Sequence, residues 1–464
     1  MNRIYIKNLR EHTGKEVLIK GWVDVRRDQG KLVFFDFRDM TGTVQGVVLP
    51  NSVAMETAKE IREEFVISVR GKVNERPDKN KQEGKQNGDI ELEILELTVL
   101  NTAITPPFDI HADTREINEE VRLKYRYLDL RNARMQKNMR MRDKIISFFR
   151  EYMHKNDFVE IETPMLMKGT PEGSREYVVP SRLHRGKFYV LPQSPQQFKQ
   201  LAMVAGFEKY FQIARCMRDE DQRGDRQPEF TQLDFEMSFV EKEDVLKYTE
   251  AMFLELVKTL YPEKKITETP FPRLTYKEVM ERYGGDKPDL RKDKNDKDEL
   301  AFVWIIDFPM FEKTANGEIQ AAHHPFCAIN PEDKEKFAKG EDIFSIRANS
   351  YDLVLNGYEL SSGSIRIHND TEQKRVFELL NIGEEEQQLK FGHMLEAFKY
   401  GAPPHGGFAP GIDRIVMLLQ GEPNIREVIA FPKTGEGKDL MMNAPAEVDD
   451  KQLKELGVSI KKSP

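Results

Sequence analysis

The densest group of side chains that could do chemistry lies between residues 215 and 239. Apolar and polar residues alternate on both sides of a charged loop, which predicts two strands. In the second strand Leu233, Phe235 and Met237 share one face. Taken alone, a charged loop is more often a solvated surface hairpin. A tight hairpin needs only about two to five loop residues, so the length of this loop also suggests binding of a charged ligand. The loop carries Asp219, Asp221, Arg223, Asp225 and Arg226.

Two further stretches favour the same interpretation. Residues 406–419 place small residues and Pro410 directly before an apolar helix, with Arg414 in its first turn. Residues 122–155 have an amphipathic helical pattern, and residues 157–166 after them predict a strand that ends at Pro164. We therefore expect cationic side chains from separate segments to meet in one site.

In chain order, segments 157–166, 215–239 and 406–419 resemble the three signature motifs of class II aminoacyl-tRNA synthetases. The resemblance covers nearly the whole chain, and the amino-acid sequence of the motifs is most similar to that of aspartyl-tRNA synthetases of bacterial type. It implies an α+β protein with two parts. The first is an N-terminal five-stranded OB-fold β-barrel, and the second is a catalytic domain built on an antiparallel β-sheet flanked by helices.

Length and composition set bounds on the protein class. A chain of 464 residues predicts two or three domains. The net charge of −8 argues against a general basic coat, so any polyanion must be bound by local basic patches. Cys216 and Cys327 match no metal-binding spacing, which fits a reducing compartment. We expect a cytoplasmic protein without structural zinc and without a membrane span.

The domain boundaries follow from the pattern of strands and breaks. Residues 1–104 contain five strand-like runs with a helix-like interruption near residues 51–63, which indicates an OB-fold barrel. Residues 105–120 form a linker interrupted by Pro106 and Pro107. Residues 121–464 form the catalytic domain. Bacterial aspartyl enzymes carry a large inserted domain that is missing here, where a short polar turn at residues 291–300 stands in its place.

The barrel supplies side chains of the types that bind single-stranded nucleic acid, namely aromatic, basic and amide groups. Phe34 and Phe35 are adjacent on a strand, so at least one of them must point into the barrel core. The resemblance implies that Phe34 faces outward and stacks on an anticodon base, that Gln45 reads the middle base, and that Arg27 lies nearby.

The resemblance also implies the nucleotide chemistry. The carboxylate of the amino acid attacks the α-phosphorus of ATP, so the site must supply positive charge, and no general base is needed because the nucleophile is already ionised. Arg218 would bridge the two anions, Arg414 would meet the γ-phosphate or the purine, and Glu220 would orient the adenine amino group. The expected ATP-binding residues are Arg218, Asp219, Glu220, Gln227, Phe230, Glu359, Gly411, Ile412, Asp413 and Arg414.

A magnesium site is predicted from carboxylates on two strands. Asp352 and Glu359 offer the oxygen ligands that Mg²⁺ prefers, although a hydrated surface pair would look the same in sequence. Glu359 and Arg366 are an odd number of residues apart, so a bulge at residues 361–363 is needed to bring both into one site. His323 and His324, read as neighbours on a strand, should point to opposite faces and make a poor metal pair.

Selection of the amino acid is a question of charge. An aspartate side chain needs cations, and Lys199 and Arg366 would supply two of them. Asparagine would leave buried cations unpaired, which a polar site can penalise by several kcal/mol, so the site favours aspartate. The expected aspartate-binding residues are Glu172, Gln196, Lys199, Arg218, Asp234, His323 and Arg366.

Three alternatives stay open at this point. An asparaginyl enzyme of the same subclass is the nearest, a lysyl enzyme would need acidic residues at Lys199 and Arg366, and a catalytically silent RNA-binding paralogue would not need Arg218 or Arg414. Gln29 lies where the family often signals whether tRNA(Asn) is charged along with tRNA(Asp), but glutamine there settles nothing. The resemblance also implies a homodimer.

Overall fold

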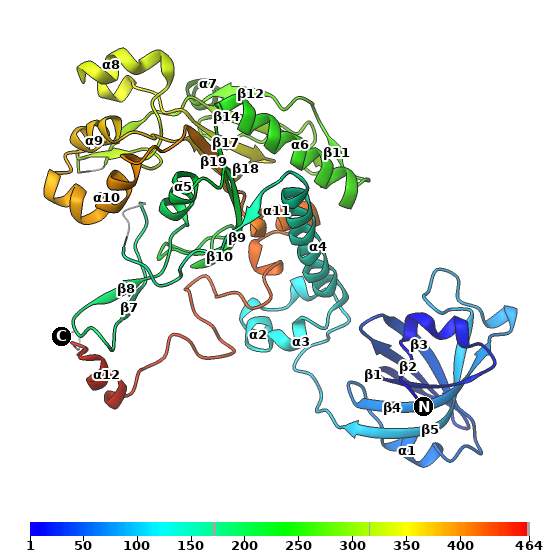
Figure 1. The fold of residues 1–464 in the computed structure, drawn as a ribbon. Coiled ribbons are helices and arrows are strands. Elements are labelled where there is room, and N and C mark those ends of the chain that lie inside the picture. The colour runs from blue at the N-terminus through cyan, green and yellow to red at the C-terminus, as the bar shows by residue number, and fades with distance from the viewer. Residues whose placement is uncertain (170–172, 315, 462–464) are drawn as a thin grey trace. The chain divides into compact units, whose positions relative to one another are not determined.

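The computed structural model describes residues 1–169, 173–314 and 316–461. The chain divides into two units, Met1–Asp109 and Ile110–Pro464 (Figure 1). Within the described residues, no helix is both long enough and apolar enough to cross a bilayer. Glu172, one of the predicted aspartate-binding residues, lies outside the described part of the chain.

The first unit is a closed five-stranded barrel, as the sequence predicts. Its strands are β1 (Glu16–Asp28), β2 (Val33–Asp39), β3 (Gly42–Val48), β4 (Val66–Glu75) and β5 (Ile90–Asn101), in the order β1-β2-β3-β5-β4. Helix α1 (Met55–Glu60) lies between β3 and β4, and the 3₁₀ helix η1 (Ile6–His12) precedes β1. Strand alternation places the two adjacent phenylalanines on opposite faces of β2. Phe35 is fully buried in the barrel core, and Phe34 lies half-buried on the outer face.

The second unit is built on an eight-stranded sheet with the order β12-β14-β17-β18-β19-β10-β9-β6. The six central strands pair antiparallel, whereas the edge strands β12 and β6 pair parallel to their neighbours, so the sheet is mixed at its margins. The strands are β6 (Val159–Glu160), β9 (Lys209–Met217), β10 (Glu229–Ser238), β12 (Arg273–Thr275), β14 (Phe302–Ile306), β17 (Ser350–Leu355), β18 (Tyr358–Ile365) and β19 (His405–Phe408).

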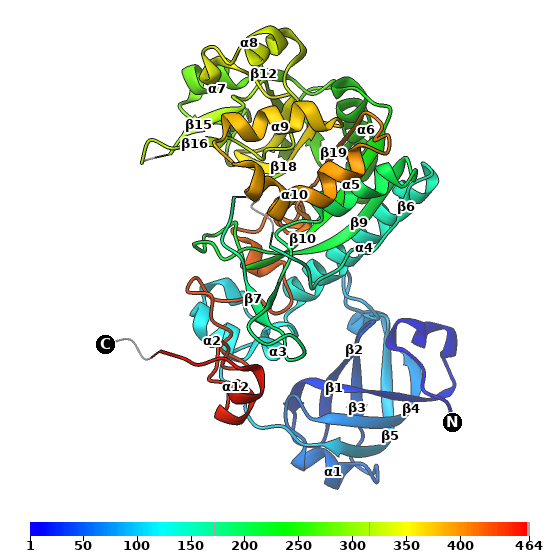
Figure 2. The same cartoon turned by 60° about the vertical axis from the view of Figure 1, so that its left-hand side comes forward.

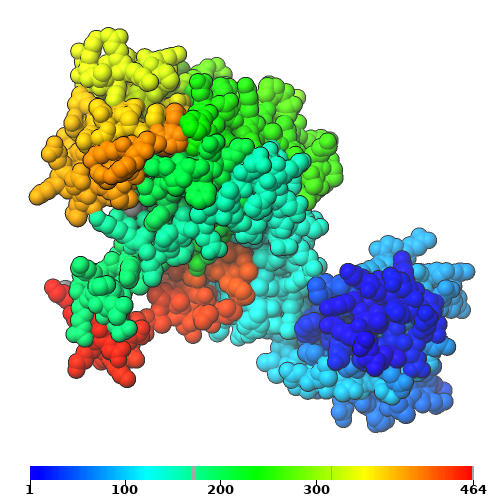
Figure 3. Space-filling model, viewed as in Figure 1, coloured from blue at the N-terminus to red at the C-terminus, as the bar shows by residue number. Residues whose placement is uncertain are grey.

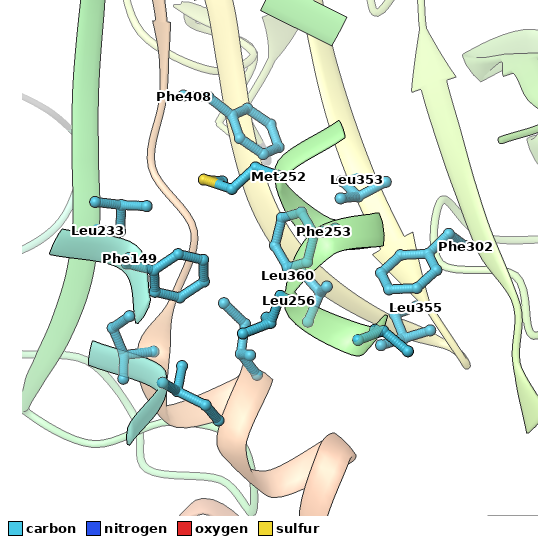
Figure 4. Close-up of a cluster of buried hydrophobic side chains, with 14 of the residues drawn as sticks. Phe149, Leu233, Met252, Phe253, Leu256, Phe302, Leu353, Leu355, Leu360 and Phe408 are labelled. Atoms are coloured by element: carbon cyan, nitrogen blue, oxygen red, sulfur yellow. The ribbon is translucent and has the colours of Figure 1, made fainter. Parts of the chain in front are cut away.

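The hairpin β9–β10 confirms the predicted pair of strands around the charged loop, and its register runs from Glu229↔Met217 to Met237↔Lys209. On one face of β10, Leu233, Phe235 and Met237 enter the main core (Figure 4 shows part of this core). On the other face Asp234 and Glu236 are also fully buried. A strand that buries apolar side chains on one face and carboxylates on the other must lie between a core and a polar site.

Helices α4 (Ala133–Lys155), α6 (Lys242–Leu260) and α11 (Ile412–Gln420) supply core residues that pack with the apolar side chains of the sheet. Helix α5 (Gln196–Val204) contacts β9, β10 and α10. Figure 2 shows α5 beside α10. The other helices are α7 (Tyr276–Tyr283), α8 (Lys334–Lys339), α9 (Asp370–Leu379), α10 (Glu384–Phe398) and α12 (Asp450–Leu456). Short two-stranded sheets pair β7 (Val178–Pro180) with β8 (Phe188–Val190), β11 (Lys265–Ile266) with β13 (Glu299–Leu300), and β15 (Phe311–Lys313) with β16 (Ile319–Ala321).

Two predicted elements differ from the structure. The helical pattern over residues 122–155 is broken into α2 (Glu119–Lys124), α3 (Arg126–Asp129) and α4, because Tyr125 leaves helical geometry and the Asn132 side chain caps α4 by accepting from the Arg134 N–H. The strand predicted over 157–166 is only the two residues of β6. Asp157 before it has φ 66, and Pro164 after it has no N–H to donate.

A buried ion-pair network holds α2 and α3 against residues 422–430. Figure 3 shows these segments, coloured cyan and orange-red, side by side. Arg122 donates to both Asp129 and Glu427, with its Nη2 2.7 Å from Glu427 Oε2. Arg134 reaches the same Glu427 oxygen at 2.8 Å. Burial on its own would raise the pKa of Glu427, but the two arginines lower it below its usual value.

Replacement of Glu427 by alanine is expected to lower the unfolding free energy of this unit by about 3–5 kcal/mol, because two guanidinium groups lose their shared acceptor inside the protein. Denaturant unfolding of the full chain measures the loss. Glu396, which pairs with Lys399 on the surface, is the matched control, and Glu396→Ala should change stability by less than about 0.5 kcal/mol. Equal losses in the two variants would contradict a stabilising role for the network.

Candidate active site

A pocket of about 690 Å³ lies over the polar face of the central strands. Its walls come from α5, the 218–228 loop, the start of α11, β18 and the segment after β16. It brings together most of the predicted site residues, which were chosen from segments up to 218 positions apart. They are Gln196, Lys199, Arg218, Asp219, Glu220, Gln227, Phe230, Asp234, His323, Glu359, Arg366, Gly411, Asp413 and Arg414.

Arg218 opens the charged loop directly after β9. Its guanidinium lies over the Phe230 ring, 5.0 Å from the centroid, a geometry in which the ring face attracts the cation and fixes its plane. Its Nε is buried and has no hydrogen-bond partner among the described residues. A buried donor without an acceptor is costly, so Arg218 is placed to bind an anion that enters the pocket.

Glu220 and Asp219 connect the loop to the segment at 173–175. Glu220 accepts a hydrogen bond from the Ser174 hydroxyl, and Arg226 Nη1 lies 3.6 Å from its other oxygen. The Asp219 N–H donates to Arg175 O at 3.1 Å. The two segments therefore form one wall of the pocket.

Arg414 projects from the first turn of α11, as predicted. Its Nη1 donates to Glu359 O at 2.7 Å, and its Nη2 lies 3.2 Å from Asp225 Oδ2. Lys287, which the sequence analysis did not single out, lies with its Nζ 2.9 Å from Glu359 Oε2. Two cations thus lie beside Glu359. Burial alone would raise the pKa of Glu359, but Arg414 and Lys287 lower this pKa below its usual value.

A bulge does bring Glu359 and Arg366 to the same site, but it lies at Leu360 and not at residues 361–363. Leu353 pairs with Ser361, and Val354 pairs with Glu359, so Leu360 is the extra residue. Asp352 on the neighbouring strand is buried, does not line the pocket, and has a pKa raised well above its ordinary value by burial and then by Glu359.

The two carboxylates fit a divalent cation. Asp352 Oδ1 is buried without a hydrogen-bond partner in the described chain, and the raised pKa of Asp352 is what burial beside a second carboxylate produces. A cation with oxygen ligands would satisfy this atom and relieve the repulsion.

The prediction that the paired histidines point to opposite faces was wrong. They lie in a turn after β16 and not on a strand, so both side chains face the pocket. His323 Nδ1 lies 3.2 Å from Ser362 Oγ, and Arg366 Nη1 lies 2.8 Å from His324 Nε2. Burial lowers the pKa of both rings. Arginine can only donate, so His324 Nε2 accepts from Arg366, while the Phe326 N–H points at His324 Nδ1 from 3.2 Å.

Two buried cations lie at one end of the pocket. Lys199 Nζ is 2.9 Å from Asp234 Oδ2 and 3.5 Å from Glu236 Oε2. Arg366 donates twice to Glu236, at 2.9 and 3.3 Å. All four side chains are at most 2% exposed. Burial raises the pKa of Asp234, whereas for Glu236 the effect of burial is outweighed by Arg366 and Lys199, which lower it.

Glu236 is a site residue that sequence reasoning missed. The signal was available, because it follows Asp234 by two residues on the same strand and so shares its face. Its carboxylate is accommodated by Gly407 on β19, where an added Cβ would lie 2.0 Å from Glu236 Oε2 and 2.2 Å from Phe235 O. Only glycine allows this close approach.

Other predicted residues are engaged differently. The Gln227 amide exchanges hydrogen bonds with the Lys433 backbone at 2.7 and 3.1 Å. The Asp413 carboxylate accepts from Arg142 and from the Thr231 N–H, so it ties α11 to α4 and β10. Ile412 is fully buried in the core and does not line the pocket.

The three predicted anticodon residues share the outer face of the barrel. Arg27 pairs with Phe34 across β1 and β2, and Arg27 donates twice to Asp36, at 2.8 and 3.0 Å. Asp36 in turn pairs with Gln45 on β3, whose side-chain oxygen accepts from Arg76 at 3.0 Å. An aromatic ring beside an oriented guanidinium and an amide suits stacking and hydrogen bonding to bases.

Residues 118–435 match the family described as tRNA synthetases class II (D, K and N), and residues 17–100 match the OB-fold nucleic acid binding domain. The chain is 41% identical to the aspartate–tRNA(Asp/Asn) ligase of Rubrobacter xylanophilus, over 97% of this chain and 95% of that protein. It is 39% identical to the aspartate–tRNA ligase of Macrococcus caseolyticus, over 97% and 96%. The Rubrobacter alignment spans 574 positions against the 464 residues here, so that relative carries segments that this chain lacks.

Solved structures share the fold. The asparaginyl-tRNA synthetase of Pyrococcus horikoshii, in complex with asparaginyl-adenylate, superposes with a TM-score of 0.74 at 22% identity, covering 94% of this chain and 98% of that chain. The aspartyl-tRNA synthetase of Entamoeba histolytica gives 0.72 at 24% identity, covering 93% and 91%.

Proposed function

This chain belongs to the class II tRNA synthetases of the D, K and N group, and on that premise we propose that it is an aspartate–tRNA ligase. It activates L-aspartate with ATP to aspartyl-adenylate and transfers the aspartyl group to the 3′ end of tRNA(Asp). The observation that carries the choice of amino acid is the pair of buried cations, Lys199 and Arg366, in the pocket that Arg218 also lines.

The first step brings two anions together, and Arg218 is the group that meets both. It would contact the aspartate α-carboxylate and the α-phosphate as the carboxylate oxygen attacks and pyrophosphate leaves. The Phe230 ring fixes its plane before substrate arrives, so little reorganisation is needed during the reaction. On this proposal Phe230 and Glu220 also bind the adenine. Arg414 contacts the γ-phosphate after its ion pair with Asp225 breaks.

The amino-acid end is selected by complementary charges. The α-ammonium would bind Asp234, whose Oδ1 is buried without a partner in the described structure, and Gln196, which lines the same pocket. The side-chain carboxylate of aspartate would bind Lys199 and Arg366, with His323 closing the pocket. Asparagine would offer these cations a neutral amide in place of a carboxylate, which a buried polar site penalises strongly.

Asp352 and Glu359 would hold Mg²⁺, which supplies charge neutralisation to the phosphates of ATP when bound. Lys287 then has to leave Glu359 or share it. Omitting Mg²⁺ from an assay of pyrophosphate exchange into ATP tests this assignment. Unchanged exchange without a divalent cation would rule out the magnesium site.

The barrel face with Arg27, Phe34 and Gln45 would bind the anticodon, and the loop at residues 222–226 would meet the acceptor end. The Rubrobacter relative is named for both tRNA(Asp) and tRNA(Asn), so we extend the proposal to tRNA(Asn). Cys216 and Cys327 are both buried, which is compatible with the reducing cytoplasm that we propose.

We also propose a homodimer, formed through the segment that begins at β6. Val159, Met165 and Leu166 are 43%, 38% and 52% exposed, and a second copy would cover these apolar side chains. Sedimentation velocity tests the homodimer, and a monomer at micromolar concentration would rule the dimer out.

The test of the proposed function is exchange of labelled pyrophosphate into ATP. We expect exchange that depends on aspartate and is at least about 10²-fold weaker with asparagine, followed by charging of purified tRNA(Asp) and tRNA(Asn). Exchange driven better by asparagine would identify an asparaginyl enzyme. A protein that binds tRNA without exchange would be the silent paralogue.

A further inference from the structure

A chain of three buried side chains runs from the start of β19 to the pocket. His405 Nδ1 lies 2.8 Å from Pro403 O, and Gln200 Nε2 lies 3.2 Å from His405 Nε2. At the other end of the Gln200 amide, Gln196 Nε2 lies 3.0 Å from Gln200 Oε1. Gln200 and His405 are completely buried, and Gln196 is 6% exposed and lines the pocket.

The chemistry of each group fixes the direction of every bond in this chain. A backbone carbonyl can only accept, so Nδ1 of His405 carries a proton. Burial lowers the pKa of His405, which keeps the ring neutral, although Glu236 opposes this shift and Arg366 and His368 add to it. A neutral ring protonated at Nδ1 accepts at Nε2. Gln200 must therefore present its NH₂ to His405 and its oxygen to Gln196.

The same logic orients Gln196. Its NH₂ is committed to Gln200, so its Oε1 is the end available to the pocket. An oxygen in that place accepts a hydrogen bond from an ammonium group, whereas an NH₂ there would face the ammonium with like partial charge. The lone pairs of one backbone carbonyl, at Pro403, thus determine the polarity of an amide two side chains away.

We infer that Gln200 and His405 are positioning residues for amino-acid recognition, holding Gln196 with Oε1 toward the α-ammonium of aspartate. The inference rests on the proposed function. Neither residue touches the substrate. Their effect is on how well the amino acid binds, and not on ATP or on the transfer of the adenylyl group.

The test is Gln200→Met, which keeps a straight side chain of similar length and removes both hydrogen bonds. The KM for aspartate should rise about tenfold or more, since a charge-assisted hydrogen bond is weakened, while kcat and the KM for ATP should stay within about twofold. Gln197 is the matched control. It is an adjacent buried glutamine on α5 whose amide atoms have no partner in the described structure, and Gln197→Leu should leave all three constants unchanged.

Two more variants make the outcome decisive. The Gln200→Glu variant should keep the KM for aspartate within about threefold of the wild-type value. Its carboxylate still accepts from Gln196, and it favours protonation of His405, with which it then pairs. His405→Leu removes the other end of the chain and should raise the same KM if Gln200→Met does not fold. An unchanged KM for aspartate in both breaking variants, or an equal rise in the KM for ATP, would overturn the inference. Wild-type protein without aspartate-dependent exchange would instead overturn the proposed function.

Discussion

Arg218→Ala is expected to reduce aspartate-dependent pyrophosphate exchange by on the order of 10²- to 10³-fold, because the variant removes the cation that both reacting anions share. Its guanidinium is held over Phe230 at 5.0 Å and makes no structural ion pair that is described. The fold should therefore survive, and thermal unfolding should be close to wild type. The loss should appear mainly in kcat, since the charge matters most as pyrophosphate leaves.

Two controls make this expectation specific. Arg215 lies on β9, just before Arg218, pairs with Glu229 on the surface and does not line the pocket, so Arg215→Ala should keep nearly normal exchange. Arg218→Lys retains the charge but loses the planar fork that binds two oxygens, and it should recover only part of the rate. Near-normal exchange in Arg218→Ala would remove the central assignment of the site.

Much of the fold could be predicted because strand alternation is a local property of the sequence. The five barrel strands and the β9–β10 hairpin were predicted this way, and so was the inward side chain of the Phe34–Phe35 pair. The breaks were predicted less well. Helices α2, α3 and α4 have one continuous apolar pattern, and only the backbone at Tyr125 and the cap at Asn132 divide it.

The site was predictable in its residue types but not in its pairings. That Glu359 and Arg366 need a bulge follows from counting residues, yet its place at Leu360 depends on how β17 pairs with β18. The two histidines were assigned to opposite faces because a strand was assumed, and the turn after β16 places both in the pocket. Glu236 shares the face of Asp234 by strand alternation, but its pairing with Arg366, 130 residues away, depends on the fold.

Arg366 makes several of these pairings, and its replacement should have a second large effect, on aspartate binding. Four of its five N–H bonds have partners in the described structure. Two go to Glu236, one goes to Ser364 and one goes to His324. The fifth, on Nη2, is available to the side-chain carboxylate of aspartate. A guanidinium held this firmly binds an added anion with little further loss of side-chain entropy.

Arg366→Met should raise the KM for aspartate by on the order of 10²-fold or more, because truncating one partner of a buried charge pair removes about 2–5 kcal/mol of binding. It should also destabilise the fold by about 3–5 kcal/mol, since Glu236 stays buried with only Lys199 beside it. The preference for aspartate over asparagine should fall in parallel.

The double variant Arg366→Met with Glu236→Gln separates the two effects. Removing both charges leaves the net charge of the buried cluster as it is in the wild type, so most of the lost stability should return. Aspartate affinity should not return, because the donor that meets the substrate is still missing. If the double variant regained wild-type KM for aspartate, the effect of Arg366 would lie in holding the fold, and Lys199 would be the cation that selects the amino acid.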